Sequence, residues 1–165
     1  MAEKAVVGIL MGSDSDLPVM QEAADILKKF GVPYEMTVSS AHRTPARTAK
    51  YARSAAQRGI KIIIAGAGSA AHLAGFIAAE TTLPVIGVPI DAGPLKGLDA
   101  LLSTVQMPGG VPVAAMAIGK AGAKNAGVFA AEVLALSDES LAGKIKDYRK
   151  EMVKQVEQKA RNIKG

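Results

Sequence analysis

Five short apolar runs alternate with five helical patterns along this 165-residue chain, and this alternation limits the possible folds more than any other feature. The runs, rich in β-branched residues, are Ala5–Leu10, Tyr34–Val38, Lys61–Ala65, Val85–Val88 and Val113–Ile118. The helical patterns lie at Leu17–Phe30, Pro45–Arg58, Leu73–Glu80, Leu98–Met107 and Lys124–Leu136. Strand–helix alternation predicts parallel strands joined by right-handed crossovers. We therefore expect a flavodoxin-like, doubly wound α/β fold, with a five-stranded parallel sheet in the order 2-1-3-4-5 inside a three-layer α/β/α arrangement.

Residues that favour helix ends flank the first two helical patterns. Ser15 or Asp16 is expected to cap the first helix at its N-terminus, and Gly31 follows its end. Pro45 suits the first position of the second helix, which is expected to close at Gly59.

A further helix, about Asp138 to Lys159, remains after the α/β unit is complete. Its apolar residues fall at steps of three and four on one face: Leu141, Ile145, Tyr148, Met152 and Val156. Such a stripe packs either on its own domain or on a neighbouring subunit. We expect one domain over 1–165, with 138–165 forming a C-terminal helix that docks on neighbouring subunits.

Composition excludes several classes of function. The chain is 49% hydrophobic and 21% charged, which is globular, and the absence of cysteine excludes disulfides and a cysteine nucleophile. The net charge of +5 resides in the last 22 residues, where its alternating signs indicate a solvated helix face, so nucleic-acid binding is not expected. No apolar run reaches the ~20 residues of a membrane span, and no signal-peptide pattern opens the chain. A cytoplasmic location is expected.

Ligands of such sheets bind at the carboxyl ends of the strands, which makes 11–16, 39–45, 66–72, 89–97 and 119–125 the candidate loops. In the first loop, Gly12 allows a tight turn. Free backbone N–H groups with the Ser13 and Ser15 hydroxyls would cradle a phosphate, and Asp16 would turn toward sugar hydroxyls. A plain helix cap explains the same residues.

Two later loops hold both histidines of the chain. His42 lies beside Arg43, whose guanidinium can bind phosphate or carboxylate, and a neutral imidazole near pH 7 can both give and take a proton. A surface histidine in a turn is the alternative. His72 follows a small, glycine-rich loop at the start of a helix. Gln106, before a Pro-Gly-Gly turn, either reaches a heteroaromatic ring or belongs to a merely rigid turn.

Six segments in this order resemble the class I N5-carboxyaminoimidazole ribonucleotide mutases along essentially the whole chain. They read MGSDSD, SSAHRTP, IIIAGAGSAAHLAG, PVIGVP, GLDALLSTVQMPGGVPV and AIGKAGAKNA. The resemblance implies isomerisation of N5-carboxyaminoimidazole ribonucleotide to 4-carboxy-5-aminoimidazole ribonucleotide in purine biosynthesis, without metal or organic cofactor, by a homo-octamer. Three departures from the family pattern fall together, with Ser69, Ala74 and Phe76 in place of Gly, Pro and Met.

The same resemblance assigns roles to particular residues. His42 would be the general acid and base. The substrate, a phosphoribosyl aminoimidazole, would contact Ser13, Ser15, Asp16, Ser40, Ala41, Arg43, Gly68, Ser69, His72 and Leu73.

Two other functions stay open from the sequence. A class II relative would carboxylate aminoimidazole ribonucleotide with free CO2, although Arg43 and the loop of His72 resemble class I. A non-catalytic nucleotide- or flavin-binding module is the other, against which the absence of Trp argues.

Overall fold

The computed structural model of the chain describes residues 4–163 and divides into two compact units, which part between Ala130 and Ala131. The first unit contains the whole sheet. The second contains the last turns of one helix and all of the final helix. The single-domain organisation expected for 1–165 stays a prediction.

The sheet of the first unit has five parallel strands in the order β2-β1-β3-β4-β5, which confirms the expected topology. The strands are β1 (Val7–Met11), β2 (Tyr34–Val38), β3 (Ile62–Gly68), β4 (Val85–Ile90) and β5 (Ala114–Ala115). Met11 of β1 pairs with Val38 of β2 and with Gly66 of β3. The loops that follow these three strands therefore start at the same edge of the sheet.

The central strands are buried, as their continuous apolar runs predict. Every residue of β1 and β4 is buried, because helices cover both faces of a parallel sheet. Strand β5 is shorter than the expected Val113–Ile118. Beyond Ala115 the chain still follows β4, with the Met116 N–H donating to the Gly87 carbonyl at 2.9 Å, but it leaves the regular pairing of an edge strand.

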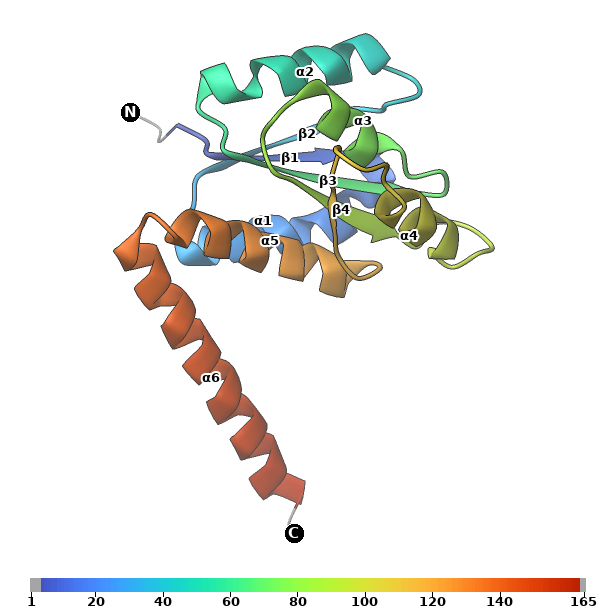
Figure 1. Cartoon of the computed structure of the whole chain (residues 1–165). Coiled ribbons are helices and arrows are strands. Elements are labelled where there is room, and N and C mark those ends of the chain that lie inside the picture. Colours follow the sequence, from blue (N-terminus) through green and yellow to red (C-terminus); the bar gives the residue numbers. More distant parts are fainter. Residues whose placement is uncertain (1–3, 164–165) are drawn as a thin grey trace. The chain divides into compact units, whose positions relative to one another are not determined.

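Helices lie on both faces of the sheet (Figure 1). Figure 1 places α2 and α3 on one face and α1 with the first part of α5 on the other. The helices are α1 (Leu17–Phe30), α2 (Pro45–Arg58), α3 (Leu73–Glu80), α4 (Leu98–Val105) and α5 (Lys120–Ala135). Gly31 and Gly59 end α1 and α2 in the left-handed region, with φ of 73° and 97°, as expected.

Two close contacts fix how the helices pack on the sheet. On the face under α2 and α3, a buried cluster joins Leu10 and Ile63 of the sheet to Ala52 of α2 and Ile77 of α3. On the other face, a Cβ at Gly127 of α5 would lie 2.8 Å from the Ala23 carbonyl of α1, so glycine permits that approach. Burial of both faces holds the sheet rigid, and its carboxyl edge therefore offers a stable support for a site.

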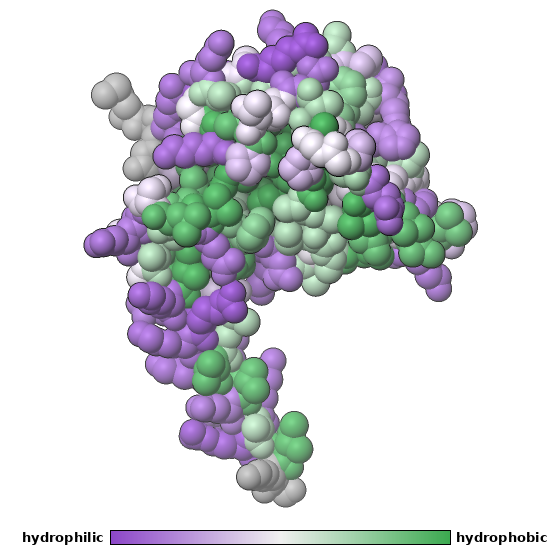
Figure 2. All heavy atoms as spheres, viewed as in Figure 1, coloured by the Kyte–Doolittle hydropathy of each residue, from purple (hydrophilic) through white to green (hydrophobic). Residues whose placement is uncertain are grey.

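The second unit contains α6 (Glu139–Ile163), close to the expected Asp138–Lys159. The Asp138 carboxylate accepts the Leu141 N–H at 3.0 Å, and Arg149 pairs with Glu132 at 2.8 Å. The apolar stripe divides in two: Leu141 and Ile145 are buried, while Met152 and Val156 are 44% and 67% exposed. Figure 2 shows apolar side chains interrupting the polar surface of this helix.

No helix in residues 4–163 is both long and apolar enough to cross a membrane.

Candidate active site

The loop after β1 folds back on itself as a 3₁₀ turn, η1 (Asp14–Asp16), capped by Ser13. The Ser13 hydroxyl accepts the Ser15 N–H at 3.3 Å, and the Asp16 carboxylate accepts the Ser13 N–H at 3.1 Å. This reciprocal capping box explains the alternation of Ser and Asp in the loop.

This geometry refines one expectation about the first loop and corrects another. Asp16 does occupy the N-cap position of α1, as expected, but its side chain makes no cap hydrogen bond there, and the side-chain cap of this loop is Ser13 on η1. The backbone N–H groups of Ser13 and Ser15 are not free for a phosphate, because Asp16, Ser13 and Asp14 side chains already accept them. The sequence contains the competing acceptors, but only the three-dimensional turn shows which donors they occupy.

Asp16, the last residue of this turn, is buried, and one oxygen of its carboxylate, Oδ2, accepts the Ser13 N–H. Burial raises the pKa of Asp16, and the hydrogen bond from the Ser13 N–H together with the positive charge of Arg43 opposes that rise. A carboxylate held this way is a strong acceptor for hydroxyl groups placed against it.

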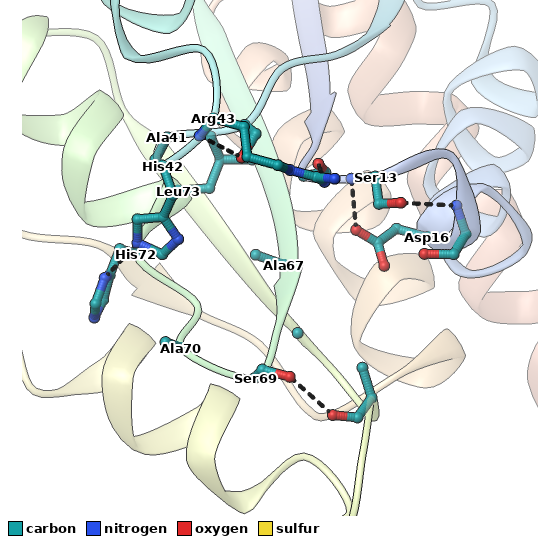
Figure 3. Close-up of a pocket in the computed structure, with 15 residues that line it drawn as sticks. Ser13, Asp16, Ala41, His42, Arg43, Ala67, Ser69, Ala70, His72 and Leu73 are labelled. Atoms are coloured by element: carbon teal, nitrogen blue, oxygen red, sulfur yellow. Dashed lines mark hydrogen bonds between the residues drawn. The ribbon is translucent and has the colours of Figure 1, made fainter.

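The loop after β2 presents His42 and Arg43 from a closed turn. The Ser40 hydroxyl accepts the Arg43 N–H at 3.1 Å, and the Thr44 hydroxyl donates to the Ser40 carbonyl at 3.0 Å. Arg43 then reaches across to the first loop, where its Nη2 donates to the Gly12 carbonyl at 2.9 Å. The guanidinium is therefore fixed between the ends of β1 and β2 (Figure 3).

The loop after β3 is built from small residues held close to the end of β4. A Cβ at Gly68 would lie 2.5 Å from the Ala92 Cβ, so glycine is required there. Ser69 adopts φ of 55°, a left-handed conformation that favours glycine, and its hydroxyl donates to the Ala92 carbonyl at 3.0 Å. This bond gives the Ser69 hydroxyl an acceptor in that conformation.

The two histidines meet at the margin of the site. His42 Nε2 and His72 Nδ1 lie 2.8 Å apart, and the rings are edge to face, with centroids 4.9 Å apart and an interplanar angle of 89°. Both side chains are exposed. Sequence reasoning placed each histidine in the site but did not predict the hydrogen bond between them.

These loops enclose one pocket of about 320 Å³, drawn in Figure 3. All eleven residues that the sequence proposed line it: Ser13, Ser15, Asp16, Ser40, Ala41, His42, Arg43, Gly68, Ser69, His72 and Leu73. Their functional roles stay predictions. Four further residues complete the wall, namely Gly12, Ala67, Ala70 and Ala92. They lack reactive groups, so position at the end of a strand was the signal that could have found them.

Two candidates that the sequence left open do not line this pocket. Within residues 4–163, the wall of this pocket includes neither Gln106, an exposed residue at the end of α4, nor any residue of 119–125. In the same range, no three His, Asp or Glu side chains gather as a metal ion would require.

The fold and the pocket define a flavodoxin-like α/β protein with a polar site at the carboxyl edge of its sheet, where β1 separates β2 from β3. The model of the AIR carboxylase family matches residues 6–155. The chain therefore belongs to the AIR carboxylase family.

Individual relatives agree with this assignment. The chain is 57% identical over 162 residues to a protein of Pyrococcus horikoshii named N5-carboxyaminoimidazole ribonucleotide mutase, covering 98% of this chain and 90% of that protein. A Bacillus subtilis protein of the same name is 61% identical over 150 residues, covering 91% and 92%. The crystal structure of Treponema denticola PurE superposes with a TM-score of 0.86 at 29% identity, covering 96% and 98% of the two chains.

Proposed function

We propose that this chain is an isomerase of de novo purine biosynthesis, which converts N5-carboxyaminoimidazole ribonucleotide to 4-carboxy-5-aminoimidazole ribonucleotide. One observation carries the proposal: a single small pocket has His42, a group able to transfer protons, and Arg43, a fixed cation, in its wall. The mutase name of relatives 57% and 61% identical over nearly the whole chain supports it.

The polar groups of the pocket suit the parts of this nucleotide. The phosphate would bind both the Arg43 guanidinium and the Ser15 hydroxyl. Arg43 gives one N–H to the Gly12 carbonyl and has further N–H donors for the phosphate. The buried Asp16 would accept from ribose hydroxyls. The aminoimidazole would then lie toward His42 and the loop after β3.

The reaction needs one proton, given and then recovered. Protonated His42 donates to N5 as the N5–carboxylate bond breaks, which releases CO2 and leaves a nucleophilic carbon C4. C4 attacks the CO2 and forms the new carbon–carbon bond. Neutral His42 then removes the proton from C4, so the enzyme returns to its starting state and no proton is gained or lost.

The small residues of the pocket would retain the CO2 between the two steps. Ala67, Gly68, Ala70 and Ala92 present no polar side chain to it. Held beside C4, the CO2 reacts as in an intramolecular step at high effective concentration. A pocket of this kind favours recapture over escape.

An isotope experiment tests the proposed function. The reaction starts with substrate that carries ¹³C in the carbamate carbon, in buffer with excess unlabelled bicarbonate. A mutase passes the label to the C4 carboxylate of the product largely undiluted.

Product without label would contradict the mutase reaction and indicate a carboxylase that draws on free CO2. That enzyme would also accept the uncarboxylated nucleotide at low bicarbonate. A chain that binds the nucleotide but leaves it unchanged would instead be a binding module.

We also propose that the chain assembles as a homo-octamer in which α6 docks on neighbouring subunits. The octamer is what the family resemblance implies. The exposed apolar side chains Met152, Val153 and Val156 on α6 support it, because burial against another subunit would remove them from water. The cytoplasmic location stays a prediction as well.

A further inference from the structure

The contact between His42 and His72 is a hydrogen bond between two particular ring nitrogens. It joins Nε2 of His42 to Nδ1 of His72, at 2.8 Å, which is a hydrogen-bond distance. The ring of His72 projects from a fixed backbone, since its N–H donates to the Ala70 carbonyl and its carbonyl accepts the Phe76 N–H. The two rings reach the pocket margin from separate loops (Figure 3).

A hydrogen bond between two imidazole nitrogens requires one proton and one lone pair. If His72 Nδ1 carried the proton, His42 Nε2 would have to be its acceptor. Once His42 is protonated, however, both of its ring nitrogens carry hydrogen, and two N–H groups would then face each other. That arrangement would break the contact at every turnover.

The opposite arrangement survives both states of His42. With the proton on His42 Nε2 and the lone pair on His72 Nδ1, the same bond exists whether His42 is neutral or protonated. Only Nδ1 of His42 then changes, as a base when it is bare and as an acid when it is protonated. A partner that fixes the tautomer of a proton-transferring histidine is a recurrent device in catalysis.

We propose that His72 is a positioning residue that keeps the proton on Nε2 of His42, so that Nδ1 of His42 performs the proton transfers. The inference rests on the proposed function for its catalytic consequence, but the hydrogen bond itself belongs to the resting protein. His72 acts through His42 and transfers no proton to or from the substrate.

Two substitutions at one position separate this role from that of a wall residue. In His72→Asn, the amide oxygen can occupy the place of Nδ1 and accept from His42. In His72→Leu, the acceptor is gone while an apolar side chain still fills space. We expect His72→Asn to keep kcat within about tenfold and His72→Leu to lose about a hundredfold or more, while KM changes to a similar extent in both, since both remove the ring expected to contact the substrate. Equal kcat values for the two variants would overturn the proposal.

Nuclear magnetic resonance reads the tautomers without turnover. The sequence contains only two histidines, so protein labelled with ¹⁵N in histidine gives two ring systems, and His72→Leu assigns them directly. At a pH where both rings are neutral, two-bond ¹H–¹⁵N correlations should place the proton of each ring on Nε2. In His72→Leu, His42 should become a mixture of tautomers, and in His72→Asn it should stay protonated on Nε2.

The two measurements also separate this inference from the proposed function. A protonated Nδ1 on His72, or a single unchanged tautomer of His42 in His72→Leu, overturns the inference even if the native chain is a mutase. If the native chain fails to convert the nucleotide, the proposed function fails, and the tautomers alone decide the inference. Circular dichroism of both variants serves as the control for folding.

Discussion

The Nη2 atom of Arg43 donates to the carbonyl of Gly12 at 2.9 Å, and this bond joins the loop after β2 to the loop after β1. The residues are 31 positions apart in the sequence, but β1 and β2 are neighbours in the sheet. The bond fixes the guanidinium in the pocket wall before any ligand arrives. A cation held in place loses less conformational entropy on binding an anion than a mobile one.

Removing this cation should weaken substrate binding. We expect Arg43→Ala to raise KM by about tenfold or more, since a charge-assisted pair with an anion is lost. The KM of Arg43→Lys should lie between those of Arg43→Ala and the native protein, because an ammonium keeps the positive charge but cannot make a bidentate contact with the anion. Steady-state kinetics on the N5-carboxylated nucleotide provide the measurement.

Ser13→Ala is the matched control for this prediction. The Ser13 hydroxyl donates to the Asp14 carboxylate at 3.0 Å, so it is committed within its own loop and its loss should change KM only mildly. Equal KM values for the native protein, Arg43→Ala and Ser13→Ala would contradict the placement of the phosphate.

Replacing His42 should separate chemistry from binding. We expect His42→Asn to abolish turnover while the dissociation constant of the nucleotide stays within about tenfold, or ~1.4 kcal/mol. The reason is that the proposed phosphate and ribose contacts lie on other residues, while proton transfer has no substitute. Calorimetric titration with the product and a sensitive turnover assay check the two parts, and near-native turnover would show that the assigned role is wrong.

The sequence predicted this fold in detail because local signals agreed with the tertiary structure. The bounds of α1 and α2 follow from Pro45 and the glycines at 31 and 59, which act through backbone geometry alone. The length of β5 depends on how far this edge strand keeps its backbone pairing with β4, and no local sequence pattern specifies that. The shared carboxyl edge of parallel strands indicated the loops, and the family resemblance named the eleven residues, which all line the pocket.

What the sequence could not provide was the pairing of polar groups within the site. Ser13 and Asp16 satisfy the backbone donors that had been expected to bind phosphate. His42 and His72 are 30 residues apart, and their contact depends on the rotamers of two exposed rings. Both results depend on where side-chain atoms lie in three dimensions, which strand and helix patterns do not specify.

The pKa of Asp16 predicts a pH dependence of stability. Burial raises this pKa above the ordinary 3.8, so the folded state binds the proton more tightly than the unfolded state. The resulting contribution to stability is fully present below about pH 3.8 and is lost as pH rises through the raised pKa. Asp16→Asn, which keeps an oxygen to accept the Ser13 N–H, should escape this loss.

Urea unfolding at several pH values checks this prediction. The free energy of unfolding of Asp16→Asn, relative to the native protein, should rise between about pH 4 and pH 7. Asp14→Asn, at an exposed neighbouring carboxylate, is the control for charge in the same turn. A difference that falls as pH rises would show that burial does not dominate at Asp16.

Gly122 tests the packing that supports the sheet. A Cβ at this position in α5 would overlap the backbone carbonyl of Ala117. Because a backbone atom cannot swing aside like a flexible side chain, we expect Gly122→Ala to lower the free energy of unfolding by about 2 kcal/mol or more.

Gly143→Ala is the matched control, since this helical glycine of α6 has no described atom within 4 Å of an added Cβ. There alanine should raise stability by about 0.5–1 kcal/mol through the unfolded state. Both variants can be compared by thermal and urea unfolding, and a neutral Gly122→Ala would contradict the predicted overlap.

The exposed half of the α6 stripe predicts how the chain assembles. Light scattering of the native chain should give about eight times 17.0 kDa if the octamer forms.

The double variant Met152→Glu with Val156→Glu places two charges where α6 is proposed to be buried. Desolvating unpaired carboxylates costs several kcal/mol each, so the double variant should give smaller species. Lys154→Glu, at an exposed polar position of the same helix, changes the charge without touching the stripe and should leave the mass unchanged. Truncation before Ser137 should also yield smaller or aggregated species. A native monomer at micromolar concentration, or a double variant that keeps the native mass, would contradict docking through this helix.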